Sequence, residues 1–209
     1  MIKTAILVDG GWMTKLLKIK LKKKFVTAEQ VYNNAISVLQ DDECLYRLFY
    51  YDAAPYDQKQ TNPLSQRVKD FSKTPAYNGG QRFLKELNER PQVALRLGSL
   101  KFRGWQLQET FHKKLLNNQT STSSISQNDI APVFMQKGVD MKIGIDIASL
   151  VFKKQVSRII LFSGDTDMIP AMKLARMEGT QIVIMKIGNS ISSELIADSD
   201  FVRTLNVIP

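Results

Sequence analysis

Residues 158–167 read RIILFSGDTD, and this stretch decides the fold. Arg158–Phe162 is a short β-rich apolar run without helical spacing, which predicts a strand buried on both faces. Ser163–Asp167 then turns the chain, and the spacing beyond it predicts a helix from about Met168 to Glu178, ended by Gly179. A buried strand that passes through a polar turn into a helix is typical of an α/β protein.

The alternation of strands and helices extends towards both ends of the chain. The sequence predicts further strands at Ile2–Val8, Leu45–Tyr51, Val93–Leu100, Gln181–Ile187 and, at an edge of the sheet, Phe201–Leu205. It predicts helices at Trp12–Leu21, from the capping box at Thr27 to about Leu39, around Phe83–Leu87, at Val139–Phe152 and at Ser190–Ala197. This order implies a mostly parallel sheet that binds ligands outside the carboxyl ends of its strands.

Composition narrows the class of protein. The chain has 209 residues, a length that predicts a single domain. No apolar stretch approaches the roughly 20 residues that span a bilayer. Because Met1–Val8 runs directly into Asp9 without the features of a secretory signal, we expect a soluble, cytoplasmic protein without a membrane partner. Cys44 is the single cysteine and His112 the single histidine, so a disulfide and a Cys/His zinc site are excluded. The net charge of +9 favours a polyanionic partner.

The pattern fails between about residues 103 and 135. Asn117–Asp129 is almost entirely Ser, Thr, Asn and Gln, a composition that buries little apolar area. We therefore expect one domain over residues 1–209 with a mobile insertion at about 103–135.

Four aspartates are expected at one edge of the sheet. Asp9 ends the first strand, Asp165 and Asp167 follow the strand Arg158–Phe162, and Asp140 lies in the first turn of the helix that begins at Val139. Clustered carboxylates raise one another's pKa, so a cluster that stays ionised needs a cation, and Mg²⁺ or Mn²⁺ suits an all-oxygen shell. The sequence predicts a divalent-metal site here.

Three of the four aspartates also have a purely structural interpretation. Asp9 can stabilise a turn with Gly10-Gly11, Asp140 can act as a charge at a helix N-terminus, and Asp167 can be the N-cap of the next helix, which leaves Asp165 the hardest to explain structurally. Asp146 lies further along its helix, where it either supports the metal ligands from a second shell or pairs with Lys142.

Three motifs resemble those of a known family. These are Ile6-Leu7-Val8-Asp9-Gly10, Lys137-Gly138-Val139-Asp140 with Asp146 further along, and Leu161-Phe162-Ser163-Gly164-Asp165-Thr166-Asp167 with Pro170 and Gly179. In order and context they resemble the NYN domain family, in its LabA-like branch, which belongs with the PIN-like nucleases. The resemblance implies a three-layer, Rossmann-like fold with a mostly parallel sheet of five or six strands between helices. It also implies a Mg²⁺ or Mn²⁺ site, formed by Asp9, Asp140, Asp165 and Asp167, that hydrolyses RNA phosphodiesters.

A metal-dependent ribonuclease is therefore the predicted function. A single histidine excludes a two-histidine ribonuclease mechanism, so metal-bound water would be the nucleophile. Lys137 is the favoured contact to nucleic acid, and weaker candidates are Ser163, Thr166, Arg82, Lys101 and Arg103. Ser163 is equally explained as a local backbone cap.

The main alternative is a catalytically inactive RNA-binding or regulatory protein on the same fold. A phosphatase of the haloacid dehalogenase type is disfavoured, because Asp9-Gly10-Gly11 lacks the second aspartate of its first motif. The sequence leaves open whether the substrate is RNA or DNA, which sequence is preferred, how many ions bind, whether a homodimer forms and which pathway uses the protein.

Overall fold

The computed structural model describes residues 1–188 and 191–209, which form two compact units. The first unit comprises residues 1–53, 82–98 and 138–209, and the second comprises residues 54–81 and 99–137. None of the helices in these described ranges combines the length and the apolar character needed to cross a membrane.

A mostly parallel sheet forms the centre of the first unit. β1 (Ile2–Asp9) pairs in parallel with β2 (Glu43–Ala54) and with β7 (Arg158–Phe162), and β7, β8 (Gln181–Lys186) and β9 (Phe201–Thr204) continue the parallel pairing to one edge. On the other side the order is β2, β5 (Val93–Leu107) and β6 (Ile130–Lys137). The predicted α/β class and the edge position of the last strand are confirmed.

The sheet has seven strands where five or six were expected. The additional strand is β6, which pairs antiparallel with the distal part of β5 inside the second unit. Sequence pattern ended β5 at Leu100, but this strand continues to Leu107 and gives β6 its partner.

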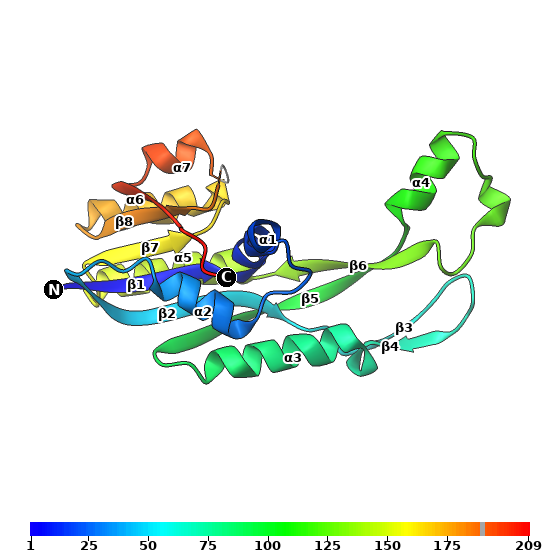
Figure 1. Ribbon diagram of the computed structural model, residues 1–209, viewed down its shortest axis with the longest axis horizontal. Coiled ribbons are helices and arrows are strands. Elements are labelled where there is room, and N and C mark those ends of the chain that lie inside the picture. Colours follow the sequence, from blue (N-terminus) through cyan, green and yellow to red (C-terminus); the bar gives the residue numbers. More distant parts are fainter. Residues whose placement is uncertain (189–190) are drawn as a thin grey trace. The chain divides into compact units, whose positions relative to one another are not determined.

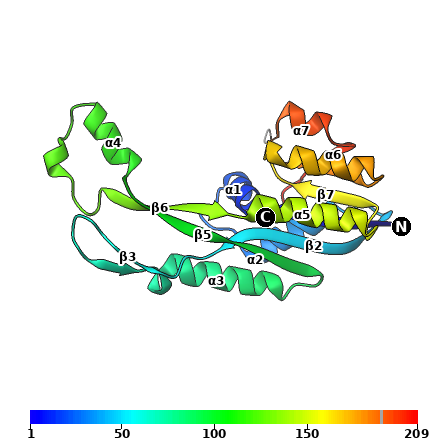
Figure 2. The ribbon, with the colours of Figure 1, turned by 180° about the vertical axis from the view of Figure 1, so that it is seen from behind.

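Helices cover both faces of the sheet in the first unit. Alternate β1 residues point to opposite faces, so that Ala5 and Leu7 pack with α5 (Val139–Phe152), α6 (Ile169–Met177) and α7 (Ser193–Ala197). Ile6 and Val8 pack with α1 (Gly10–Leu21), α2 (Ala28–Ile36) and the end of α3 (Pro75–Asn88). Figure 1 shows α1 and α2 in front of the sheet, and Figure 2 shows α5 and α6 from behind. Three layers result, as predicted.

Most predicted elements of the first unit have nearly the observed bounds. α5 and β7 match residue for residue, and the capping box at Thr27 starts α2. The helix after β7 begins with a 3₁₀ turn, η3 (Thr166–Met168), before α6. The predicted start of the last helix at Ser190 lies outside the described residues.

The second unit has a small aromatic core of its own. Its elements are β3 (Lys59–Thr61), β4 (Val68–Asp70), η1 (Phe71–Lys73), the start of α3, the distal part of β5, α4 (Glu109–Leu116), η2 (Thr122–Ser124) and β6. The Phe134 ring lies 4.9 Å from Tyr56, 5.3 Å from Phe71 and 5.9 Å from Phe102, measured between ring centroids. The range 103–135 therefore contains regular structure at both ends, and Asn117–Asp129 contains only η2.

Gly10 allows the chain to turn directly from β1 into α1. A Cβ atom at this position would overlap the phenol ring of Tyr50 and lie 2.8 Å from the Tyr51 backbone oxygen. Tyr50 is fully buried and its hydroxyl is hydrogen-bonded, so its ring has nowhere to move. A side chain at Gly11 would meet only Asp9 Oδ1, at an ordinary 3.4 Å.

We expect Gly10→Ala to destabilise the protein by about 1–3 kcal/mol, because the added methyl group overpacks a rigid site. Gly11→Ala is the matched control and should be neutral or stabilising by up to about 1 kcal/mol, because alanine favours the helix. Urea unfolding of both variants measures the difference. Equal stabilities would contradict the proposed role of Gly10.

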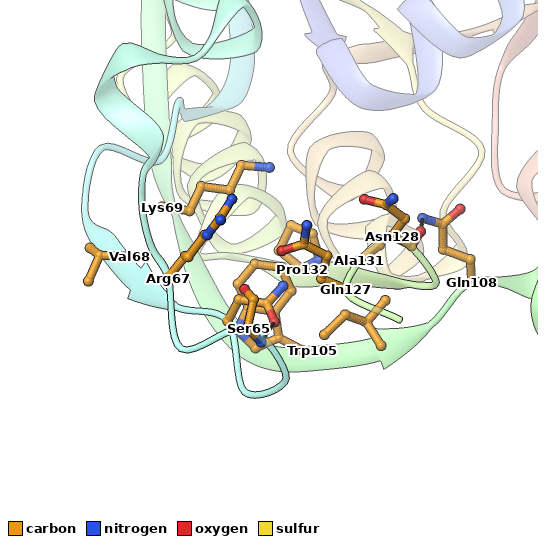
Figure 3. Close-up of a pocket in the computed structure, with 12 residues that line it drawn as sticks. Ser65, Arg67, Val68, Lys69, Trp105, Gln108, Gln127, Asn128, Ala131 and Pro132 are labelled. Carbon is orange, nitrogen blue, oxygen red and sulfur yellow. Dashed lines mark hydrogen bonds between the residues drawn. The ribbon is translucent and has the colours of Figure 1, made fainter. Parts of the chain in front are cut away.

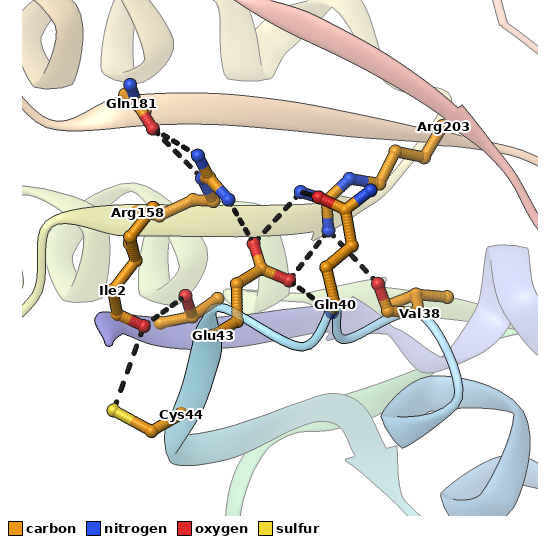
Figure 4. Close-up of polar contacts among 9 residues, drawn as sticks. Ile2, Val38, Gln40, Glu43, Cys44, Arg158, Gln181 and Arg203 are labelled. Carbon is orange, nitrogen blue, oxygen red and sulfur yellow. Dashed lines mark hydrogen bonds and ion pairs between the residues drawn. The ribbon is translucent and has the colours of Figure 1, made fainter.

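A buried carboxylate joins three strands at the opposite edge of the sheet. The Glu43 side chain is shielded from solvent and accepts hydrogen bonds from Arg158 and Arg203, and from the Gln40 backbone N–H at 2.8 Å (Figure 4). Burial opposes ionisation of Glu43, but the two guanidinium groups and the Gln40 amide outweigh it and lower its pKa to about 2. The start of β2 is thereby held to β7 and β9.

The lowered pKa of Glu43 makes stability fall in acid. An unfolded glutamate titrates near 4.5, so the contribution of about 3 kcal/mol is complete above pH 4.5 and is lost as the pH falls towards 2. Glu43→Gln should lower the unfolding free energy at pH 7 and flatten its dependence on pH between 4.5 and 2. Exposed Glu89→Gln is the control and should leave both unchanged.

Candidate carboxylate site

Strand register brings the expected acidic residues of the first unit to one edge of the sheet. Asp9 is the last residue of β1 and pairs with Tyr51 of β2, while Val8 pairs with Phe162 at the end of β7. The residues that follow, Asp52 on one side and Ser163 on the other, therefore flank Asp9 at the carboxyl ends of three adjacent parallel strands.

Asp9 combines a structural bond with an unfavourable electrostatic position. Its Oδ1 atom accepts a hydrogen bond from the Trp12 backbone N–H at 3.1 Å and caps α1. Burial, and then the nearby charges of Asp140 and Asp52, raise the Asp9 pKa to about 6, although the Trp12 amide opposes the shift. The structural interpretation of Asp9 is thus correct, and the residue also belongs to an acidic cluster.

Asp52 belongs to this cluster and was not among the predicted site residues. Its pKa is raised by burial and opposed by the Ala53 amide, the Tyr50 hydroxyl and the charge of Lys18. Tyr50 donates to Asp52 Oδ2 at 3.3 Å, and the Ala53 N–H donates to Oδ1 at 2.7 Å. The sequence signal was an aspartate directly after a buried strand, as for Asp9.

Asp140 approaches the cluster from a different element. It is an exposed residue in the first turn of α5, which begins after Gly138 in a left-handed conformation. The negative charge of Asp140 is one of the causes that raise the pKa of Asp9. The predicted proximity of Asp9 and Asp140 therefore agrees with this electrostatic coupling.

Asp165 has the capping role that the sequence suggested for Asp167. Asp165 Oδ1 accepts from the Asp167 backbone N–H at 2.9 Å, so Asp165, and not Asp167, is the N-cap of η3. Ser163 is fully buried and its Oγ accepts from the Asp165 N–H at 3.1 Å, as a local backbone cap. Asp167 and Thr166 are exposed at the start of η3, which packs against α5.

Asp146 anchors α5 to the sheet. Its Oδ2 atom forms an ion pair with Arg96 Nε of β5 at 2.9 Å and accepts from the Tyr51 hydroxyl at 2.8 Å. Pairing with Lys142 was one of the two alternatives considered for Asp146, and the observed partner is Arg96. Through Tyr51, Asp146 supports the strand end that carries Asp52.

The candidate basic residues divide between the two units. Arg82 lies in the first unit and pairs with Glu86 at 3.8 Å, whereas Lys101, Arg103 and Lys137 lie in the second unit. In the first unit, Lys18 of α1 acts on Asp52. Lys18 was not among the candidate residues of the sequence analysis.

The donor set suits a hard cation, but its side chains are not gathered around one point. Every candidate atom is a carboxylate oxygen, and the mutual repulsion at Asp9 is what a bound cation would relieve. Yet within residues 1–188 and 191–209, no three His, Cys, Asp or Glu side chains are placed to hold an ion together. Because Asp9, Asp52 and Asp165 hydrogen-bond to backbone N–H groups, some of these carboxylates would have to rotate to bind metal jointly.

The fold and site define a three-layer α/β protein with acidic residues at the carboxyl ends of its central strands. The sequence matches the NYN domain family over residues 70–206, and the chain belongs to this family, which is generally nuclease-like. The matched range includes Asp140, Asp165 and Asp167, while Asp9 and Asp52 precede it.

A solved structure supports the fold. The chain resembles a protein of unknown function from Vibrio parahaemolyticus with a TM-score of 0.55 and 14% sequence identity, over 98% of this chain and 93% of the other. The comparison with curated proteins gave no match.

The raised Asp9 pKa predicts that this residue destabilises the fold above pH 6. An unfolded aspartate titrates near 3.8 and the folded one near 6, so the folded state holds the proton more tightly and stability falls as the pH rises between these values. Asp9→Asn retains a capping oxygen and should raise the unfolding free energy at pH 7.5 by up to about 3 kcal/mol, with little effect at pH 4. Urea unfolding at both pH values measures this.

Exposed Asp41→Asn is the control and should change stability little at either pH. A loss of stability in Asp9→Asn at pH 7.5 would show that the carboxylate is favourable where it lies.

Proposed function

We propose that the protein is a metal-dependent ribonuclease of the LabA-like branch of the NYN domain family, acting in the cytoplasm. The observation that carries the proposal is the position of Asp9 at the carboxyl end of β1, where burial, and then the charges of Asp140 and Asp52, raise its pKa to about 6. Buried, mutually repelling carboxylates destabilise a fold, so their presence favours a role in function. Membership of a nuclease-like family supplies the reaction class.

The proposed metal ligands are Asp9, Asp140, Asp165 and Asp167, and Asp52 joins them as a further candidate. Bound Mg²⁺ or Mn²⁺ would lower the pKa of a water molecule and offset charge on the phosphate. Asp146 and Tyr51 would act as positioning residues, because their bond fixes the end of β2 beside Asp9. The Trp12 and Asp167 amides hold Asp9 and Asp165 until a cation competes for them.

Lys18 and Lys137 are the proposed contacts to the RNA backbone. Lys18 is exposed, and its charge already acts on Asp52. Lys137 ends β6, three residues before Asp140 in the sequence. A lysine side chain that binds phosphate would offset the repulsion between the phosphate and the carboxylates.

The alternative is an inactive RNA-binding or regulatory protein. The absence of three metal-ready carboxylates among the described residues favours this alternative. It predicts salt-sensitive RNA binding with no metal-dependent cleavage.

Cleavage of labelled single-stranded RNA in Mn²⁺ tests the proposal. Asp165→Asn and Asp140→Asn should each lower the rate by at least about 100-fold, because each removes a ligand, and EDTA should abolish cleavage. Asparagine retains an oxygen able to cap η3, so Asp165→Asn should remain folded.

Asp41→Asn is the matched control and should cleave at the wild-type rate. A thermal-shift titration with Mn²⁺ gives a second readout: the melting temperature should rise for the wild type and for Asp41→Asn, and should rise less for Asp140→Asn. Wild-type protein that binds RNA but neither cleaves it nor responds to Mn²⁺ would establish the regulatory alternative.

A further inference from the structure

The second unit contains a pocket of about 520 Å³ whose lining residues all belong to that unit (Figure 3). Its walls come from β4 and the loop before it, the end of β5, and the start of β6 with the residues that lead into it. Pockets for small molecules or single chemical groups typically measure about 300–1,000 Å³. The volume is sufficient for a nucleobase with its sugar.

The pocket combines positive charge with amide groups. Arg67 and Lys69 lie on one side in Figure 3, Gln108 and Asn128 lie on the other, and Trp105 lies below them. None of the twelve lining residues is acidic. Lysine and arginine neutralise phosphate, amide side chains offer the paired donor and acceptor that match base edges, and an indole provides a stacking surface.

Two polar groups in this lining lack hydrogen-bond partners. The Ser65 hydroxyl and the Trp105 indole Nε1 are buried, and neither has a partner among the described residues. Such groups are rare, since an unpaired buried donor is unfavourable, and each calls for an explanation such as a missing ligand. An indole N–H only donates, so its missing partner is an acceptor. Because both atoms are shielded, a ligand reaches them when part of the lining moves.

The rest of the lining is held in place. Trp105 packs edge-to-face on Phe102 of the aromatic core, with 6.0 Å between ring centroids. Gln108 Nε2 donates to the Asn128 backbone oxygen at 2.8 Å, and Asn62 Oδ1 accepts from the Ser65 backbone N–H at 3.1 Å. These contacts order the rest of the lining, so the two unpaired groups do not result from a disordered pocket.

The charge of the whole unit favours an anion. Residues 54–81 and 99–137 contain nine lysine and arginine side chains and four aspartate and glutamate side chains, an excess of five positive charges. This excess positive charge attracts a polyanion over distances of about 10 Å at moderate salt.

We propose that this pocket binds one nucleotide of a single-stranded nucleic acid. Arg67 and Lys69 hold the phosphates, Gln127 and Asn128 contact the base edge, and Trp105 Nε1 and Ser65 Oγ donate to acceptor atoms of the same nucleotide. This site is separate from the carboxylate site of the first unit, and its binding does not depend on cleavage. A single strand is favoured because only an unpaired base exposes its edge and face together.

Fluorescence anisotropy of the full chain with labelled 12-nucleotide RNA and DNA strands, in EDTA so that nothing is cut, tests the proposal. Trp105→Phe keeps the ring but removes the donor. It should raise Kd by about 3- to 10-fold and leave the melting temperature unchanged or higher, because an unpaired buried donor is removed. A structural role would instead lower the melting temperature and leave Kd unchanged, which would overturn the proposal.

Matched pairs locate the binding surface. Lys69→Gln and Gln127→Ala should each raise Kd by 3-fold or more, whereas exposed Lys73→Gln and Gln119→Ala, outside the pocket, should not. The ratio of the RNA and DNA affinities reports whether a 2′-hydroxyl is contacted. Failure of both strands to bind, equal effects within each pair, or equally tight Trp105-dependent binding of a polyglutamate peptide would refute the proposal.

Discussion

Burial of β1 on both faces is the constraint on which the first unit depends. Ala5–Val8 are completely shielded, and their alternating side chains pack against α5 and α6 on one face and against α1 and α2 on the other. A strand enclosed in this way can leave the core only at its ends. Its carboxyl end is where Asp9 lies, and Gly10 lets the chain turn there against Tyr50 without a clash. The position of the acidic site thus follows from the packing of the strand before it.

Carboxylates at the two ends of the sheet have pKa shifts in opposite directions. At Glu43 two guanidinium groups and an amide surround the carboxylate, so its pKa falls to about 2 and its charge stabilises the fold. At Asp9, burial and then the charges of Asp140 and Asp52 raise the pKa to about 6, so the ionised carboxylate is unfavourable. Two guanidinium groups neutralise the buried carboxylate of Glu43, whereas the neighbours that shift the pKa of Asp9 include no such cation. The ionised carboxylate of Asp9 therefore lowers the stability of the fold, whereas that of Glu43 raises it.

The sequence was most informative where burial leaves few alternatives. The bounds of β7 and α5 followed from apolar periodicity, and strand ends predicted that Asp9 and the acidic residues of the first unit would share an edge. Asp52 directly follows the predicted strand Leu45–Tyr51, but that signal did not give its place beside Asp9, which depends on the register of β2 against β1. The partner of Asp146 was missed for the same reason, since Arg96 is 50 residues away in sequence. Asp167 was considered as the N-cap of the following helix because the sequence did not show that a 3₁₀ turn begins one residue after Asp165.

The structure of the second unit was the hardest to predict, because its core does not arise from a periodic pattern of apolar residues. Its core is a group of four aromatic rings contributed by separate segments, which a window along the sequence cannot detect. That core fixes Phe102, and Phe102 in turn supports Trp105 at the pocket. Residues of the range 103–135, which was predicted to be a mobile insertion, thus line a polar pocket together with residues 62–69.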